Sequence, residues 1–79
     1  MVVIYTQPKC VQCRFTKNYL QHHQIPFQEV DLTTNELAKA KLQRHGWKAT
    51  PVIQVENEWF AGFQPQRLQA IAERLGGGN

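Results

Sequence analysis

The sequence predicts an α/β fold whose elements follow the order βαβαββα. Short apolar and β-branched runs alternate with segments that repeat apolar residues at helical spacing, and the last two such runs follow each other directly. A strand, a helix and a second strand imply a parallel pair with a right-handed crossover. The two adjoining runs imply a hairpin in the same sheet. A chain of 79 residues corresponds to one domain, which we expect over residues 1–75.

The first strand and the first helix lie on either side of the cysteines. Residues 2–6 (VVIYT) form a short β-branched run, which is typical of a buried strand. Beyond the cysteines, Val11, Phe15 and Tyr19 recur at the spacing of one helix face, and this apolar stripe predicts a helix. We expect the helix to end before Pro26.

A second strand and a second helix follow. Residues 26–32 (PFQEVDL) alternate between apolar and polar side chains, which predicts a strand. Thr33 and Glu36 have the spacing of a capping box, in which Thr33 would cap a helix and Glu36 would reach back to it. The helix is expected over 37–45, with Gly46 as its stop.

The remaining elements are two strands and a helix. Residues 51–55 (PVIQV) predict the third strand, and residues 59–60 (WF) lie in the fourth. Pro65 suits the first turn of a helix. Apolar residues at helical spacing mark one face of this helix: Leu68, Ile71, Ala72 and Leu75. We expect Gly76 to end the helix and residues 76–79 to form a flexible tail.

The composition argues against disorder, nucleic-acid binding and membrane insertion. Hydrophobic residues make up 42% of the chain, and nine Lys/Arg against six Asp/Glu give a net charge of +3. The basic residues are scattered, without the run of about five like charges that marks a nucleic-acid tail. No apolar stretch approaches the about 18 residues of a membrane span, and the N-terminus lacks a signal peptide's features. We therefore expect a cytoplasmic protein, whose surroundings keep thiols reduced.

The two cysteines, Cys10 and Cys13, are the only ones in the chain. A structural zinc site needs four ligands, but His22 and His23 are adjacent and His45 is distant, so the usual ligand spacing is absent. A permanent disulfide across so short a loop would stabilise the fold little. A pair of working thiols is the interpretation that fits best.

The position of the pair supports redox chemistry. The pair follows a strand and opens a helix, as a thioredoxin-like motif requires. Cys10 would lie at the helix N-terminus, where free N–H groups and the nearby charges of Lys9 and Arg14 favour a thiolate. Cys13 lies one turn further on. We therefore expect Cys10 to attack a substrate disulfide and Cys13 to resolve the mixed disulfide.

Three short motifs carry a resemblance to a known family. They are Cys-Val-Gln-Cys at 10–13, Ala-Thr-Pro-Val at 49–52 and Phe-Ala-Gly-Phe-Gln-Pro at 60–65. Through them, nearly the whole chain resembles the NrdH-redoxin family of glutaredoxin-like proteins. The resemblance implies a thioredoxin/glutaredoxin-like fold with a four-stranded mixed sheet flanked by three helices.

The resemblance also implies how substrates bind. Pro51 would be cis and lie beside the cysteines, whereas the base rate for an X-Pro bond alone predicts trans. The backbone of Thr50 would pair with an extended substrate segment. Phe60 and Phe63 could form an exposed patch for partners or belong to the core, and Trp47 is expected in the core or half-buried. The residues expected to contact substrates or partners are Lys9, Val11, Gln12, Thr50, Pro51, Phe60, Gly62 and Phe63.

The family's activity implies partners. Its members take electrons from NADPH through thioredoxin reductase and pass them to the large subunit of class Ib ribonucleotide reductase, so we expect both partners, a monomer, no bound cofactor and no metal. Two residues depart from the family pattern. Ala61 stands where the family has Ser and Gln64 where it has Arg, and both losses should thin the hydrogen-bond network of the loop before the last helix.

Three alternative functions remain open from the sequence. A glutathione-dependent glutaredoxin would share the fold and chemistry, but such proteins place an acid at the start of the last helix, where this chain has Phe63 and Gln64. A small metal-binding module would use the thiols as ligands. A monothiol iron–sulfur carrier is disfavoured by the presence of Cys13.

Overall fold

The computed structural model describes residues 1–75, and it contains the expected elements in the expected order. The expected stop at Gly76 and the tail at 76–79 lie outside the described residues. The elements are β1 (Val2–Thr6), α1 (Val11–His22), β2 (Phe27–Asp31), α2 (Glu36–Arg44), β3 (Val52–Val55), β4 (Glu58–Ala61) and α3 (Pro65–Leu75). Within residues 1–75, no helix is long and apolar enough to cross a membrane.

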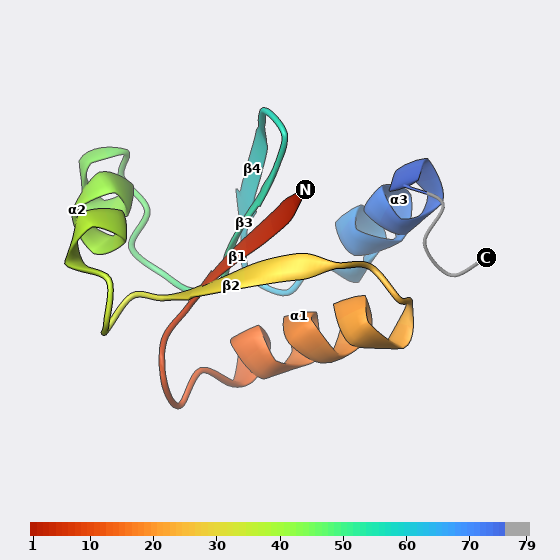
Figure 1. Ribbon diagram of the computed structural model, residues 1–79, viewed down its shortest axis with the longest axis horizontal. Coiled ribbons are helices and arrows are strands. Elements are labelled where there is room, and N and C mark those ends of the chain that lie inside the picture. The colour runs from red at the N-terminus through yellow and green to blue at the C-terminus, as the bar shows by residue number, and fades with distance from the viewer. Residues whose placement is uncertain (76–79) are drawn as a thin grey trace.

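The four strands form one mixed sheet in the order β2-β1-β3-β4. β1 runs parallel to β2, and Val2 pairs with Phe27. β1 runs antiparallel to β3, where Ile4 pairs with Ile53, and β3 and β4 form the expected hairpin. Figure 1 shows the sheet with α2 on one side and with α1 and α3 on the other. The predicted α/β fold with a mixed sheet is confirmed.

The core consists of two clusters, one on each face of the sheet. On one face, Leu20 of α1 and Leu68 of α3 pack on Ile4 and Ile53. On the other face, Leu42 of α2 packs with residues of β1 and β3, and half-buried Trp47 completes this smaller cluster. The prediction for Trp47 is therefore confirmed. The split follows from the strand period of two, which sends alternate side chains to opposite faces.

The apolar stripe predicted for α1 is not its buried face. The buried side chains of the helix are Cys13, Thr16 and Leu20, whereas Val11 is 57% exposed and Phe15 is 49% exposed. The helix is thus rotated so that Phe15 faces the loop before α3, where its ring lies 5.8 Å from that of Phe63. Helical spacing shows which residues share a face but not which face meets the sheet, and tertiary packing placed Cys13, Thr16 and Leu20 there.

The cap of α2 also differs from the prediction. Asn35, not Thr33, is the N-cap residue, and its side chain accepts a hydrogen bond from the backbone N–H of Ala38 at 3.0 Å. Thr33 instead donates to the side chain of Asp31 through its hydroxyl and its backbone N–H. Both Thr and Asn are good caps, so residue type alone did not separate them. On α3, three of the four predicted face residues are buried and Leu75 is partly exposed.

Removing the observed cap tests this assignment. We expect Asn35→Ala to lower the free energy of unfolding by about 1 kcal/mol, because an orphan helix N–H loses its acceptor. For a domain of this size that corresponds to a Tm lower by about 4–8 °C in a thermal melt. Asn18→Ala, on the exposed face of α1, is the matched control and should leave Tm nearly unchanged. Equal losses in both variants would show that the Asn35 cap contributes nothing specific.

Candidate active site

The cysteine pair lies at the junction of β1 and α1. Lys9 adopts a left-handed backbone conformation with φ of 63°, which turns the chain out of the strand. Cys10 is then the N-cap residue of α1, and its sulfur accepts a hydrogen bond from the backbone N–H of Cys13 at 3.1 Å. The sulfur therefore sits at the positive end of the helix, as expected, where a negative charge is stabilised.

The two cysteines form a disulfide and are unequally exposed. The Cα atoms of Cys10 and Cys13 are 5.2 Å apart, within the ordinary range for a disulfide. Cys13 is only 2% exposed, whereas Cys10 is partly exposed. An incoming disulfide can therefore reach the sulfur of Cys10 and not that of Cys13. The prediction that Cys10 is the more exposed of the pair is confirmed.

Thr50 and Pro51 approach the pair from the start of β3. The Thr50–Pro51 bond is cis, as the family resemblance implied. The hydroxyl of Thr50 lies 3.4 Å from the sulfur of Cys10, to which it donates a hydrogen bond. Pro51 is buried, and its carbonyl accepts a hydrogen bond from the N–H of Gly62 at 2.8 Å. Contact between the proline ring and the two sulfurs stays a prediction.

Gln12 joins the cysteine motif to the loop before α3. Its side-chain oxygen accepts a hydrogen bond from the backbone N–H of Phe63 at 3.1 Å. Gly62 has φ of 85°, and a Cβ there would come within 3.4 Å of the same Gln12 oxygen. The side-chain amide of Gln64 donates to the carbonyl of Ala61 at 2.7 Å. The loop thus keeps several hydrogen bonds despite the two departures from the family pattern.

The apolar surface beside the disulfide differs in composition from the expected patch. Phe60 is 4% exposed and belongs to the core, so its expected place in an exposed patch is wrong. As an alternating β4 residue paired with Ile53, it points into the sheet's α1/α3 face. The exposed apolar patch consists of Val11, Phe15 and the half-buried Phe63. Phe15 was not predicted to belong to this patch, although its helical spacing from Val11 placed it on the same side of α1.

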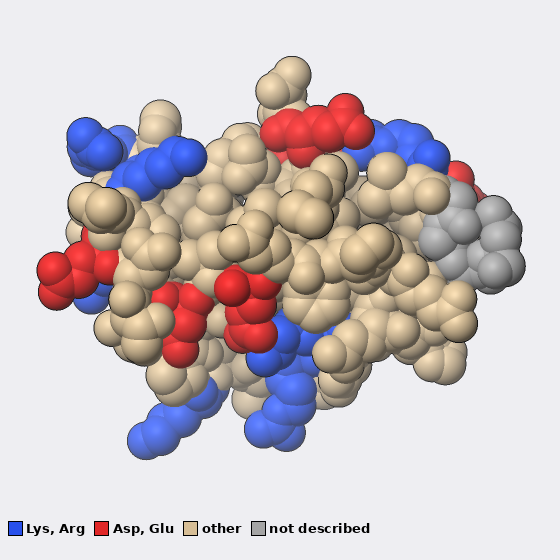
Figure 2. All heavy atoms as spheres, in the orientation of Figure 1, with Lys and Arg blue, Asp and Glu red and all other residues tan. Residues whose placement is uncertain are grey.

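A charged cleft opens on the opposite side of the pair. It has a volume of about 300 Å³ and is lined by both cysteines together with charged residues of α1 and β2. Figure 2 shows acidic atoms over β2 beside basic atoms at the start of α1. Two hydrogen bonds from Thr33 hold the pKa of Asp31 below its usual value. Sequence reasoning missed Glu29, which lies in this cleft.

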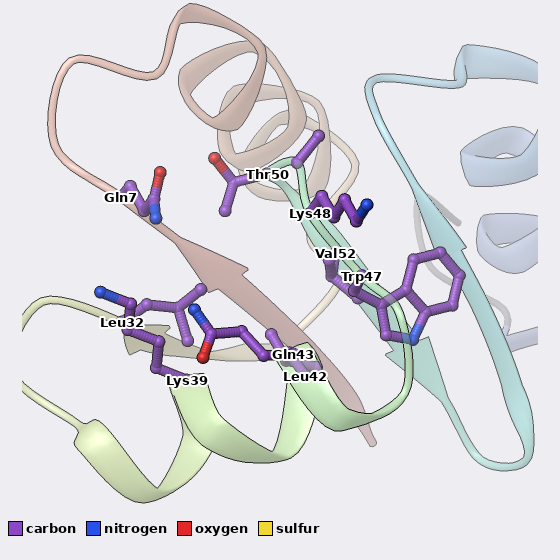
Figure 3. Close-up of a pocket in the computed structure, with 10 residues that line it drawn as sticks. Gln7, Leu32, Lys39, Leu42, Gln43, Trp47, Lys48, Thr50 and Val52 are labelled. Carbon is purple, nitrogen blue, oxygen red and sulfur yellow. The ribbon is translucent and has the colours of Figure 1, made fainter.

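A second hollow of about 300 Å³ lies between α2 and the start of β3. In Figure 3, Gln7 and Thr50 lie across this hollow from Lys39 and Gln43 of α2. Because Thr50 also contacts the sulfur of Cys10, the hollow adjoins the disulfide. Hollows thus lie on two sides of the disulfide.

The metal-binding alternative has no ligand set in residues 1–75. No group of three or more His, Cys, Asp or Glu side chains gathers there in a way that could hold a metal ion. His22 and His23 instead form an aromatic cluster with Tyr19. Cys10 and Cys13 are instead joined in a disulfide.

Comparisons with known proteins agree with this chemistry. The glutaredoxin family model matches residues 2–60. The glutaredoxin-like protein NrdH of Lactococcus lactis is 33% identical over 72 residues, which cover 91% of this chain and 100% of that protein. The chain belongs to the glutaredoxin-like NrdH family. The NrdH protein of Salmonella typhimurium is 27% identical over 70 residues, which cover 89% of this chain and 86% of that protein.

A solved NrdH structure has the same fold. NrdH-redoxin from Escherichia coli superimposes with a TM-score of 0.85 at 26% identity, and the match covers 89% of this chain and 92% of that one. The NrdH relationship and the disulfide at the helix start together make this protein a thiol–disulfide oxidoreductase. The resemblance inferred from the three motifs is confirmed.

The unequal exposure of the sulfurs predicts different outcomes for the two single cysteine variants. Cys13→Ser should attack a disulfide substrate and remain attached to it, because no second thiol resolves the mixed disulfide. Cys10→Ser should form no adduct, because the remaining sulfur is buried. Mass spectrometry of each variant after exposure to a disulfide substrate measures the adduct. Alkylation of the reduced protein at neutral pH should label Cys10 first, and faster labelling of Cys13 would reverse the assignment.

Proposed function

We propose that this protein carries electrons from thioredoxin reductase to the large subunit of a class Ib ribonucleotide reductase. The observation that carries the proposal is the pair of unequal sulfurs: an accessible Cys10 at a helix start with a buried Cys13 behind it. Membership of the NrdH family supports the choice of partners. The related NrdH-redoxin from Escherichia coli is described as having a thioredoxin-like activity profile.

The reaction moves two electrons from the dithiol to a substrate disulfide. The thiolate of Cys10 attacks one substrate sulfur and the substrate's own S–S bond breaks, which leaves a mixed disulfide and a free substrate thiolate. Cys13 then attacks the sulfur of Cys10 and releases the second substrate sulfur. The protein leaves with the Cys10–Cys13 disulfide. Thioredoxin reductase, which draws on NADPH, returns the disulfide to the dithiol, so the protein itself needs no bound cofactor.

Partner proteins would meet three features beside Cys10. The backbone of Thr50 can pair with an extended segment of the substrate in a strand-addition mode, with the substrate cysteine next to Cys10. The exposed patch of Val11, Phe15 and Phe63 would add an apolar contact. Lys9, beside the pair and exposed, would favour acidic partners. We propose that the protein acts as a monomer in the cytoplasm.

The structure around α3 favours a protein donor over glutathione. Binding the charged glutamyl end of glutathione at a helix start would need a partner for its ammonium group. The start of α3 offers Gln64, Pro65 and Gln66, without a carboxylate. The side chain of Gln64 is turned back to the carbonyl of Ala61 by a hydrogen bond of 2.7 Å. With the glutathione ammonium group, the amide oxygen of Gln64 would make only an uncharged contact, which is weaker than that of a carboxylate.

Adding the missing carboxylate tests the choice of donor. We expect thioredoxin reductase with NADPH to reduce the unmodified protein much faster than glutathione with glutathione reductase does. Gln64→Asp should raise glutathione turnover about ten- to a hundredfold, because a charge-assisted hydrogen bond is worth about 1.5–3 kcal/mol. NADPH consumption in the two coupled assays gives both rates.

The control variant adds the same charge at a distance from the helix start. Gln69→Asp lies on an exposed position one turn further along α3 and should leave glutathione turnover unchanged. The proposal for the donor fails if millimolar glutathione reduces the unmodified protein efficiently while thioredoxin reductase leaves its disulfide intact. A ribonucleotide reductase of class Ib, assayed with the reduced protein as its only reductant, tests the acceptor separately.

A further inference from the structure

The burial of Cys13 creates a need for a proton acceptor. A thiol must lose its proton before it can attack, and burial in apolar surroundings raises the pKa of a thiol. Cys13 is 2% exposed and lies on the buried face of α1 with Thr16 and Leu20. In the mixed disulfide, burial therefore disfavours the free thiolate of Cys13, and a base that takes its proton would help it to attack. Bulk solvent has little direct access to this sulfur.

One route leads from Cys13 to ionisable groups. The charged cleft of about 300 Å³ is lined by both Cys10 and Cys13, and it is wide enough for several water molecules, since one needs about 10–15 Å³ of such space. The charged groups that face this cleft come from the β1–α1 loop, from α1 and from β2: Lys9, Arg14, Lys17, Glu29 and Asp31. The two carboxylates are the only bases among these five groups at neutral pH.

Glu29 is held in the cleft by one of its two oxygens. Its Oε2 accepts a hydrogen bond of 2.8 Å from the hydroxyl of buried Thr6 and one of 3.1 Å from the ammonium of Lys17. Both of these hydrogen bonds go to Oε2 and neither goes to Oε1, and Glu29 is among the residues that line the cleft. The side chain of Glu29 is 39% exposed, so a proton that it accepts can pass on to solvent.

Asp31 is the poorer candidate of the two carboxylates. Its Oδ1 accepts hydrogen bonds of 2.8 Å and 2.6 Å from the backbone N–H and the hydroxyl of Thr33. These bonds stabilise the ionised form and hold the pKa of Asp31 below its usual value, which makes it a weaker base. Both donors belong to Thr33, in the turn that leads to α2.

We propose that Glu29 accepts the proton of Cys13, through water in the charged cleft, when Cys13 resolves the mixed disulfide. The proton passes from the Cys13 sulfur to the Glu29 carboxylate, and the electron pair left on sulfur attacks the sulfur of Cys10. The bond between Cys10 and the substrate sulfur breaks, and its electron pair leaves with the substrate as a thiolate. Glu29 then releases the proton to solvent, from which the substrate thiolate takes one up.

The inference rests on the proposed roles of Cys10 and Cys13 and is independent of the protein that supplies the electrons. The test uses an excess of dithiobis(nitrobenzoate), an aromatic disulfide whose reduction releases a coloured thiolate. In stopped flow, the reduced protein releases one coloured thiolate when Cys10 attacks and a second when Cys13 resolves. The Cys13→Ser variant should show the first phase alone. Absence of any first phase in that variant would instead refute the assignment of Cys10.

Glu29→Gln should slow only the second phase. At pH 7 we expect this phase to be at least about tenfold slower. A positioned base typically accelerates a reaction by a factor of about 10²–10⁴, and in the variant solvent water can still accept the proton at a lower rate. In the unmodified protein the second phase should change little between about pH 5.5 and 8, where a carboxylate stays ionised. In Glu29→Gln it should rise about tenfold per pH unit, in proportion to the thiolate fraction. The first phase should stay within about twofold.

Glu58→Gln is the matched control, since Glu58 pairs with Arg67 and Arg74 on the α3 side of the fold and does not line the cleft. It should leave both phases and their pH profiles unchanged. The proposal is overturned if Glu29→Gln keeps the rate and the pH profile of the second phase. It is equally overturned if both phases slow by the same factor, because Glu29 would then act on the site's structure or on both thiols alike.

Discussion

The register between β1 and β3 is the constraint on which the site depends. Tyr5 pairs with Val52, so the chain just before β3 must run beside the chain just after β1. This places Thr50 against the sulfur of Cys10, although forty positions separate them in the sequence. A slip of one residue would turn every β3 side chain to the opposite face, and would remove Ile53 and Val55 from one core cluster and Val52 from the other. The packing of Ile4 on Ile53 thus holds the chemistry in place.

The loop between β4 and α3 completes the site from a third direction. It is fixed at Gly62 by the carbonyl of Pro51 and at Phe63 by the side chain of Gln12. Gln12, which lies between the two cysteines, therefore serves the fold as well as any partner. The loop also carries Phe63, which belongs to the exposed apolar patch. The position of Phe63 in that patch is therefore set by the hydrogen bonds of the loop to the cysteine motif and to the cis-proline segment.

Much of the fold could be predicted from the sequence, because its local patterns agree with the tertiary structure. The β-branched run at 2–6, the stop at Gly46 and the hairpin all occupy the predicted places. The cysteine pair could be assigned because its chemistry depends on a local feature, the start of a helix. Pro51 could be called cis only through the family resemblance, since the base rate for X-Pro bonds favours trans.

What could not be predicted depends on how the elements meet. The spacing of Val11, Phe15 and Tyr19 fits a helix but does not say which face meets the sheet, and the buried face proved to include Cys13 and Thr16. Phe60 was expected near the active face because it and Phe63 flank Gly62, but its place in β4 turns it into the core. The group around Glu29 joins residues of β1, α1 and β2, and only the parallel register of β1 with β2 brings them together.

The position of Cys10 as the cap of its own helix links the stability of the helix to the oxidation state of the protein. In the oxidised form, the N–H of Cys13 has a neutral disulfide sulfur as its acceptor. After reduction, the same N–H and the helix dipole face a thiolate, which is a charged acceptor and binds them more strongly. By thermodynamic reciprocity, the folded helix favours the form that holds electrons, relative to an unfolded chain with the same two cysteines. The reduced protein thus has the better-capped helix. When it donates its electrons and becomes oxidised, it loses part of the stability that this cap contributes.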